Sequence, residues 1–588
     1  MTAVKTSVVR KIMWTAVIVV GFFVLLEGAL AVVGVEPERY ARDPYVGFTG
    51  RSPLFVPAED GSGDLVTARA KRSLFNPQRF PAAKERGEYR VFCVGGSTTY
   101  GRPYGDATSF CGWLRALLPV ADPTRRWRVV NAGGVSYASY RVALLMEELI
   151  DYEPDLFVIY SGHNEFLEER TYRQIIATPP AVRGLGSIAA KTRVWTALAT
   201  AIRATSGTAA EPVDDADLLD EEVTTLLDAS IGPDAYTRND AQAEKIIDHY
   251  RFNLTRMVDI AASVDADAVL IVPASNLRDS RPFKSEHRNG LGETELERFN
   301  RLVEGARKAN AEGRVDAAVE SIRAAAAIDP RHAQLAYLEG RLLYTVERWR
   351  DARQAFVRAR DEDVCPLRAP SPIADIVRAV AADRGAGLVD FEARADQWAE
   401  HAIPGSDLFL DHVHPTIQVH RRVAVDLIDE LIEMGVVTPS PDWGAPAVAE
   451  VARRVEAGIE PIDHALALMK LSKVLGWAGK LQESYVLSRR AVELFPDDSR
   501  IQYNAGLNAH LIGRKGEAIE HYRRAIELQP DADEPHGNLG VLLEEAGRLD
   551  EAERHYRAAI RYARTEATRA RNQANLDRLL AKKGEPEG

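Results

Sequence analysis

Short apolar runs alternate with amphipathic segments over the middle of the chain. Five of these runs are rich in Val, Ile, Leu and Phe: residues 89–95, 127–134, 155–162, 265–275 and 387–391. A short run that is apolar at nearly every position predicts a strand buried on both faces. Because helical segments separate these strands, the pattern predicts an α/β domain whose parallel sheet is covered by helices on both sides.

Two of the intervening segments carry clear helix signals. Residues 108–120 begin with Thr108 and Ser109, either of which can cap a helix N-terminus. Residues 140–154 are amphipathic and end at a proline, which a helix does not tolerate in its interior. We therefore expect helices in both segments, packed on the predicted sheet.

A second pattern, with a period of 34 residues, occupies residues 299–362 and 465–575. Gly479, Gly513 and Gly547 mark turns at this interval. Other small and aromatic positions recur in phase: Gly506, Ala518, Tyr522 and Ala525 correspond to Gly540, Ala552, Tyr556 and Ala559, and to Gly340, Ala352, Phe356 and Ala359. The alternative is an Ala-rich helical bundle without true repeats.

The 34-residue pattern resembles the tetratricopeptide repeat, a helix–turn–helix unit of that length. The resemblance covers about three repeats near the C-terminus and about two inside the α/β region. It implies an all-α array with a concave surface that binds a peptide or protein partner.

The N-terminal segment 12–35 is apolar over a length that can cross a bilayer, which needs ~20 residues. Lys5, Arg10 and Lys11 precede it, which favours a cytoplasmic N-terminus and an exported remainder. The Ala-Leu-Ala sequence at 29–31 also fits a signal-peptide cleavage site. The segment is thus either a transmembrane anchor or a cleaved signal, and we expect the rest of the chain on the extracytoplasmic side.

These patterns predict the following order of domains. An anchor or signal (1–35) and a stalk or extended wrap (36–85) precede an α/β domain (86–438) with insertions at 172–243 and 299–362; a linker (439–464), repeats (465–575) and a charged tail (576–588) follow.

Composition narrows the functional classes. The 588 residues carry a formal net charge of −12, which argues against nucleic acid as a main partner. Three cysteines, Cys93, Cys111 and Cys365, are too few for a disulfide framework. A Cys93–Cys111 bridge and buried free thiols are both compatible with the sequence.

The first predicted strand runs into a glycine-rich turn that carries Ser97. The stretch 91–101, VFCVGGSTTYG, lacks the lysine of a phosphate-binding loop and the glycine spacing of a dinucleotide fingerprint. A plain structural turn and the seat of a nucleophile remain as interpretations. A nucleophilic serine needs a base, a group that orients the base, and hydrogen-bond donors for the oxyanion.

Residues of those types follow other predicted strands. Asp411 and His414 are three residues apart, so the carboxylate can orient the imidazole toward a serine. Asn164 ends the third strand, and residues 131–136, which include Gly133, Gly134 and Ser136, end the second. The carboxyl ends of neighbouring strands in a doubly wound sheet line one crevice, so these groups are expected to converge.

The four blocks GGST (Ser97), NAGGVS, GHNE (Asn164) and DHVH (Asp411 and His414) resemble, in this order, those of the SGNH or GDSL-type hydrolases. The resemblance spans about residues 86–436. It implies a flavodoxin-like doubly wound sheet and ester hydrolysis, with Ser97 as nucleophile, His414 as base and Asp411 as its orienter. The implied oxyanion hole consists of Ser97 N–H, an N–H of Gly134 or Ser136, and Asn164.

This sequence departs from the family pattern at three positions. Gly96 replaces the aspartate that usually precedes the nucleophile, Ser136 stands where the family has a glycine, and Glu165 replaces the usual aspartate after Asn164. Arg278, Arg281 and Lys284 follow the fourth strand and are candidates for contacts with an anionic substrate, although a solvated loop is equally compatible. No cofactor is implied, and a metal site at Asp411, His412 and His414 would leave Ser97 without a role.

Three functions fit this sequence. The first is an exported, membrane-anchored serine esterase that removes small acyl groups, such as O-acetyl, from a saccharide or another envelope component. The second is an O-acyltransferase that uses the same residues with a sugar hydroxyl in place of water. The third is a non-catalytic repeat scaffold of an envelope complex.

Overall fold

The computed structural model describes residues 53–167, 236–477 and 479–584, with short stretches at 14, 21–23, 26–30 and 193–194. At its centre lies a five-stranded parallel sheet of β4 (Glu88–Gly95), β5 (Arg126–Gly133), β6 (Leu156–Tyr160), β7 (Asp267–Ile271) and β8 (Gly387–Val389). The strand order is β5-β4-β6-β7-β8. Counted along the chain this is 2-1-3-4-5, the order of flavodoxin-like doubly wound sheets. Each predicted run contains one strand, so the predicted parallel sheet is confirmed.

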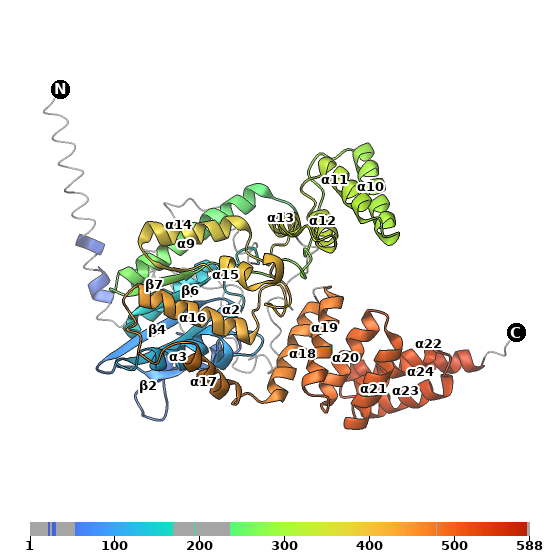
Figure 1. Ribbon diagram of the computed structural model, residues 1–588. Coiled ribbons are helices and arrows are strands. Elements are labelled where there is room, and N and C mark those ends of the chain that lie inside the picture. Colours follow the sequence, from blue (N-terminus) through green and yellow to red (C-terminus); the bar gives the residue numbers. More distant parts are fainter. Residues whose placement is uncertain are drawn as a thin grey trace.

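Helices cover both faces of the sheet (Figure 1). One face packs against α4 (Ser139–Leu149), α9 (Asp240–Ala262) and α14 (Ser371–Arg384), and the other against α3 (Phe110–Ala121), α15 (Phe391–Trp398) and α16 (Ile417–Glu433). Alternate side chains of one strand enter opposite cores: Phe92 faces the first set of helices and Val91 the second. This two-sided burial explains why the apolar runs of the strands do not alternate with polar residues.

Residues 53–85 fold onto the α/β domain, which agrees with the predicted extended wrap and not with a stalk. Strands β1 (Phe55–Pro57), β2 (Asp64–Thr67) and β3 (Arg79–Pro81) form an antiparallel sheet. Phe55 and Phe80 enter the same core as Phe92, and the Leu54 N–H donates to the Glu148 carboxylate at 2.8 Å. Strands of three or four residues are too short to produce a periodic pattern, so the sequence showed no strand here.

The helical repeats form two arrays. The inner array consists of α10 (Glu293–Ala311), α11 (Val315–Ile328), α12 (Ala333–Thr345) and α13 (Trp349–Asp361). The C-terminal array consists of α18 (Pro461–Trp477), α19 (Leu481–Leu494), α20 (Ser499–Leu511), α21 (Lys515–Leu528), α22 (Asp533–Glu545), α23 (Leu549–Tyr562) and α24 (Glu566–Gly584), which extends away from the α/β domain in Figure 1.

Two predicted boundaries need correction. The linker 439–464 contains α17 (Ala445–Glu456), whose Val451 and Ala452 are buried in the core beside α3. The first repeat helix begins at Pro461 rather than at 465. The charged tail 576–588 is helical as far as Gly584, where α24 ends, and Leu579 is buried against the last repeat. In both places apolar residues on one face of a mainly polar segment provide the packing surface.

The repeat period reflects close contact between paired helices. A Cβ atom on Gly540 of α22 would lie 2.7 Å from the Tyr556 ring of α23. Gly506 and Gly340 have the same relation to Tyr522 and Phe356, so each glycine admits the aromatic ring sixteen residues later.

Replacing Gly540 by Ala is expected to lower the free energy of unfolding of the C-terminal repeats by about 1–3 kcal/mol, because the added methyl group overpacks the contact with Tyr556. Urea unfolding followed by circular dichroism measures this change. Gly305→Ala in α10 is the matched control, since its Cβ would meet no atom within 4 Å. This control should be stabilising by about 0.5–1 kcal/mol, because Ala favours the helix interior. Equal effects of the two substitutions would contradict the packing argument.

Two predicted features fall mainly outside the described residues: most of the apolar segment 12–35 and most of the insertion 172–243. In the part of the chain that the structure describes, no helix has the length and apolar character that a bilayer crossing requires. Cys93, Cys111 and Cys365 are all buried as free thiols, so the Cys93–Cys111 bridge is not formed.

Candidate active site

Ser97 lies at the point where strand β4 turns into the short helix α2 (Ser97–Tyr100). The preceding Gly95 has a φ of +151°, and a Cβ there would lie 2.0 Å from the Tyr160 carbonyl oxygen of β6. Only glycine fits this approach between neighbouring strands. The sharp turn places the hydroxyl of Ser97 at the carboxyl end of the sheet, where ligands bind in doubly wound folds.

His414 joins Ser97 and Asp411 by hydrogen bonds. Its Nε2 is 2.8 Å from the Ser97 Oγ, and its Nδ1 is 2.6 Å from the Asp411 Oδ2. The other carboxylate oxygen of Asp411 accepts the N–H groups of Val413 and His414, each at 2.8 Å. The loop before α16 therefore fixes the carboxylate, and the carboxylate orients the ring.

The electrostatic environment keeps Asp411 ionised. Burial by itself raises the pKa of this carboxyl, but the nearby histidines and the hydrogen bonds from His414 bring the pKa well below its usual range. An ionised carboxylate can only accept, so Nδ1 of His414 carries its hydrogen. In the neutral ring Nε2 is then the acceptor for the Ser97 hydroxyl.

Two other histidines near this site are held neutral. Burial lowers the pKa of His163 and of His412 to about 3. The Ala369 N–H donates to His163 Nδ1 at 3.2 Å, and His412 packs edge-to-face on Phe283. Neither ring is bonded to Ser97 in the described residues, so His414 alone among these three histidines is placed as its base.

Asn164 lies against the turn that carries Ser97. Its Nδ2 donates to the Tyr137 carbonyl oxygen at 3.0 Å, which leaves the second N–H of the amide available. A Cβ on Gly96 would lie 2.6 Å from the same Nδ2. The glycine that departs from the family pattern is therefore the residue that lets the Asn164 amide approach the turn.

The structure corrects the role predicted for Gly134. Its N–H donates to the Gly95 carbonyl oxygen at 2.9 Å and continues the ladder between β5 and β4. Ser136 differs, because within the described residues its N–H has no hydrogen-bond partner, and neither has the N–H of Ser97. Ser136 has a φ of +62°, in the left-handed region that glycine adopts most easily. This conformation explains why a glycine is usual at this position of the resembled family.

Glu165 has a positioning role that the sequence analysis did not identify. Its fully buried carboxylate accepts the Ser139 Oγ–H at 2.7 Å and the Ser139 N–H at 3.0 Å, at the first residue of α4. A carboxylate is favourable at a helix N-terminus, so Glu165 ties the Asn164 loop to that helix. The only signal in the sequence was its position directly after Asn164.

The cationic residues expected to contact a substrate have protein partners instead. Arg278 donates to Asp407 at 2.8 Å and to Asp279 at 3.2 Å. Lys284 donates to the Tyr236 carbonyl oxygen and lies 3.2 Å from Glu286. Both side chains therefore fix the loop after β7. In the residues that the structure describes, no group of three His, Cys, Asp or Glu side chains is arranged to hold a metal ion.

Comparison with known proteins identifies the repeats. Residues 510–547 match the family model described as TPR repeat, and residues 534–566 match that of the tetratricopeptide repeat. Both matches lie C-terminal to the α/β domain. No curated protein matches the chain.

Solved repeat structures are similar to parts of the chain. One is the Yersinia enterocolitica secretion chaperone SycD in complex with a YopD peptide, with 20% identity over 20% of this chain and 92% of that chain and a TM-score of 0.19. A second is YrrB, a TPR protein with a peptide-binding site, with 13% identity over 46% of this chain and 90% of that chain and a TM-score of 0.18. A third is the first TPR of Spaghetti (RPAP3) bound to an HSP90 peptide, with 14% identity over 21% of this chain and 94% of that chain and a TM-score of 0.20. From the 34-residue period, the paired helices and the matching family models, the C-terminal array of this chain consists of tetratricopeptide repeats.

Proposed function

We propose that the α/β domain is a serine esterase of the SGNH type. The observation that carries this proposal is the pair of hydrogen bonds from His414, to Ser97 at 2.8 Å and to Asp411 at 2.6 Å. Nucleophile, base and orienting carboxylate are recognised by this geometry rather than by their order in a sequence. The flavodoxin-like strand order and the position of Asn164 beside the turn are further support.

The reaction follows from these positions. As Ser97 Oγ attacks the acyl carbon, its proton passes to His414 Nε2, and the carbonyl oxygen becomes an oxyanion. The proton then goes to the departing alkoxide, which leaves as an alcohol. An acyl-serine remains at residue 97. His414 next takes a proton from water, and the hydroxide attacks the acyl-serine. The carboxylic acid is released as His414 returns the proton to the Ser97 Oγ. Asp411 stays ionised and stabilises the imidazolium at each stage.

The oxyanion needs donors that are not already used. The proposed set is the N–H of Ser97, the N–H of Ser136 and the second N–H of the Asn164 amide. Fixed donors aimed at developing charge stabilise the transition state more than mobile water does. Gly134 is excluded from the set because its N–H is bonded to Gly95.

The proposed substrates are small acyl esters, with O-acetyl groups of a saccharide as one class. If a sugar hydroxyl replaces water in the second half-reaction, the same residues act as an O-acyltransferase. Hydrolysis of short-chain nitrophenyl esters with and without sugar acceptors separates these outcomes. We further propose that the repeats bind a protein or peptide partner, as tetratricopeptide arrays do through their concave surface.

We also propose that residues 12–35 hold the chain at a membrane, with the enzyme on the extracytoplasmic side. Support comes from the apolar sequence and from Lys5, Arg10 and Lys11 before it. Full-length protein should sediment with membranes, and a chain without residues 1–35 should not. Equal distribution of the two forms would contradict the anchor.

A fluorophosphonate probe tests the nucleophile directly, because such probes attach covalently to activated serines. The wild-type chain should be labelled at one residue, and Ser97→Ala should remove the label. Ser440→Ala is the control, since this serine lies in the loop before α17 and should leave labelling unchanged. Labelling that survives in Ser97→Ala would refute the nucleophile, and an unlabelled wild-type chain would favour a repeat scaffold.

A further inference from the structure

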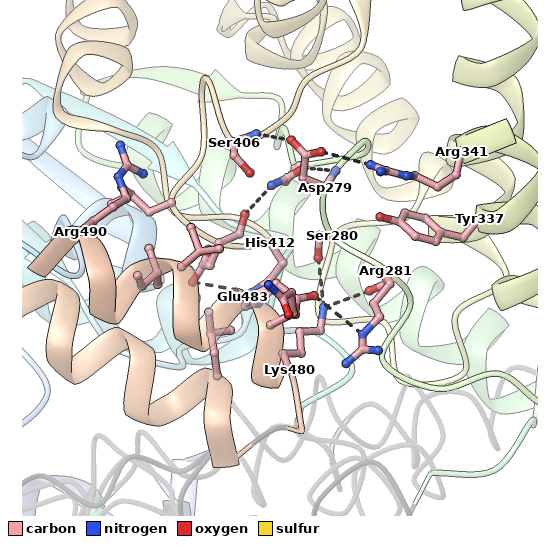
Figure 2. A pocket seen from close by; sticks show the side chains of 17 residues that line it. Asp279, Ser280, Arg281, Tyr337, Arg341, Ser406, His412, Lys480, Glu483 and Arg490 are labelled. Atoms are coloured by element: carbon pink, nitrogen blue, oxygen red, sulfur yellow. Dashed lines mark hydrogen bonds and ion pairs between the residues drawn. The ribbon is translucent and has the colours of Figure 1, made fainter. Parts of the chain in front are cut away.

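A cavity of about 400 Å³ lies where the C-terminal repeats meet the α/β domain (Figure 2). Its walls come from segments far apart in the chain: the loop 276–281 after β7, helix α12 of the inner repeats, the loop 406–412, and helices α18 and α19. This volume falls in the range of small-molecule sites, ~300–1,000 Å³. The cavity therefore exists only when both repeat arrays are docked on the domain.

Lys480 joins the C-terminal repeats to the floor of this cavity. It is 3% exposed, and its Nζ donates to the Ser280 Oγ at 3.0 Å and to the Arg281 carbonyl oxygen at 2.9 Å. The ammonium group also lies 3.5 Å from the centre of the Phe283 ring. Burial lowers the pKa of Lys480 to about 7. These contacts fix α19 relative to the loop after β7.

The cavity borders the catalytic segment without including the reacting groups. Asp411 and His412 contribute to its wall, but Ser97, His414 and Asn164 do not. The Asn276 N–H, in the same wall, donates to the His412 carbonyl oxygen at 3.0 Å. A molecule in the cavity would therefore lie beside the loop that holds the catalytic imidazole, and apart from the ester bond.

One wall is apolar. Leu410 from the catalytic loop and Leu475, Val486 and Leu487 from α18 and α19 line the space. Val486 is 47% exposed, an unusual position for an aliphatic side chain that faces a cavity. Arg490 follows Val486 by one helical turn, so the two lie on the same face of α19.

The charges around this wall do not cancel. Among the lining residues, Arg341 lies 3.6 Å from Asp279, and the ionised Asp411 is bonded to His414. Arg281 lies 3.8 Å from Glu483, and the charge of Lys480 interacts with the same carboxylate. Arg490 has no ion-pair partner in the described ranges. The lining thus combines an apolar wall with an arginine, Arg490, whose charge is not paired within the described residues.

We propose that this cavity is a second ligand site and that it binds an amphiphilic anion, a carboxylate or phosphate head group carried on an apolar chain. The head group pairs with the guanidinium of Arg490, and the chain lies against Val486, Leu487 and Leu475. A free fatty acid and a membrane lipid both carry this chemistry.

Calorimetry with the full Ser97→Ala chain tests the site without any turnover. Octanoate should bind, and octanamide, which has the same chain but no charge, should bind at least fivefold more weakly. Arg490→Gln should weaken octanoate at least fivefold and leave octanamide unchanged, because only the charge contact is lost. Val486→Asp should weaken both ligands, because it puts a carboxylate on the apolar wall.

Arg489→Gln is the matched control. This neighbouring arginine is exposed, pairs with Glu493 and does not line the cavity, so octanoate affinity should stay within twofold. Circular dichroism confirms that each variant is folded. Equal affinity for octanoate and octanamide, or octanoate affinity unchanged in Arg490→Gln, would overturn the proposal.

A second arm uses vesicles that contain an anionic phospholipid and a Ser97→Ala chain without residues 1–35, so that the proposed anchor does not itself bind the vesicles. If monomeric octanoate binds and competes with vesicle binding, the cavity is supported and lipid is one source of its ligand. If octanoate binds and vesicles do not, the ligand of the site is a free acid. Vesicle binding without octanoate binding would place the anionic chemistry on an outer surface and refute the cavity. Since Ser97 is replaced throughout, the result does not depend on the proposed esterase activity.

Discussion

Replacing His414 by Ala is expected to lower kcat/KM for a short-chain nitrophenyl ester by roughly 10⁴-fold, the upper end of the effect of general acid–base catalysis. His414 Nε2 is the group 2.8 Å from the Ser97 hydroxyl, and without it the nucleophile keeps its proton. The leaving alkoxide also loses its proton donor, so both half-reactions are slowed. Steady-state kinetics with a purified chain that lacks residues 1–35 give the ratio.

His401→Ala provides the matched control. This histidine stacks on Trp349 with 3.8 Å between ring centres, in the turn after α15, and has no contact with Ser97. Its loss should change kcat/KM less than twofold. A loss smaller than about tenfold for His414→Ala, with the fold intact, would mean that another group activates Ser97 and that the proposed base is wrong.

The architecture was largely predictable because burial leaves a pattern in the sequence. Strands β4 to β8 are covered on both faces, so the buried middle of each strand is apolar. The repeats were predictable because each glycine must admit an aromatic ring sixteen residues later, as Gly540 admits Tyr556. Strands β1 to β3 pack on the core of one sheet face through isolated residues such as Phe55 and Phe80, and isolated residues do not create periodicity.

The candidate site was predictable where side chains carry the chemistry. Ser97, Asp411, His414 and Asn164 each follow a strand or precede a helix, and a doubly wound sheet brings such positions to one edge. The sequence left Gly134 and Ser136 as alternative donors, because the partner of the Gly134 N–H depends on the register of β5 with β4, which composition does not reveal. For Arg278 and Lys284 the sequence left substrate contact and a solvated loop open, because partners such as Asp407 and Tyr236 come from distant segments.

The contact between the repeats and the catalytic domain was beyond the reach of the sequence. Lys480 occupies a turn of the repeat, a position where a solvated lysine is common. In the structure the same side chain is buried against Ser280 and Phe283, next to the loop of His412. The repeat array is therefore part of the surroundings of the candidate active site as well as a surface for partners.

Asn164→Ala is expected to lower kcat by ~10²–10³-fold with little change in KM, because an oxyanion donor acts mainly in the transition state. The substitution also removes the 3.0 Å hydrogen bond to the Tyr137 carbonyl oxygen, which is expected to lower the free energy of unfolding by about 0.5–1.5 kcal/mol. The two effects separate on measurement, since a loss of stability of that size leaves the chain folded at 25 °C.

Fluorophosphonate labelling of Asn164→Ala distinguishes a donor from a merely structural residue. If Asn164 only holds the loop, stabilising the loop should also restore the rate, and kcat relative to that of the wild type should recover when an osmolyte is added. If Asn164 is an oxyanion donor, the rate of Asn164→Ala stays low under those conditions, while Ser97 of the variant still reacts slowly with the probe. Full recovery of kcat would remove Asn164 from the oxyanion hole and leave the backbone N–H groups of Ser97 and Ser136 as its donors.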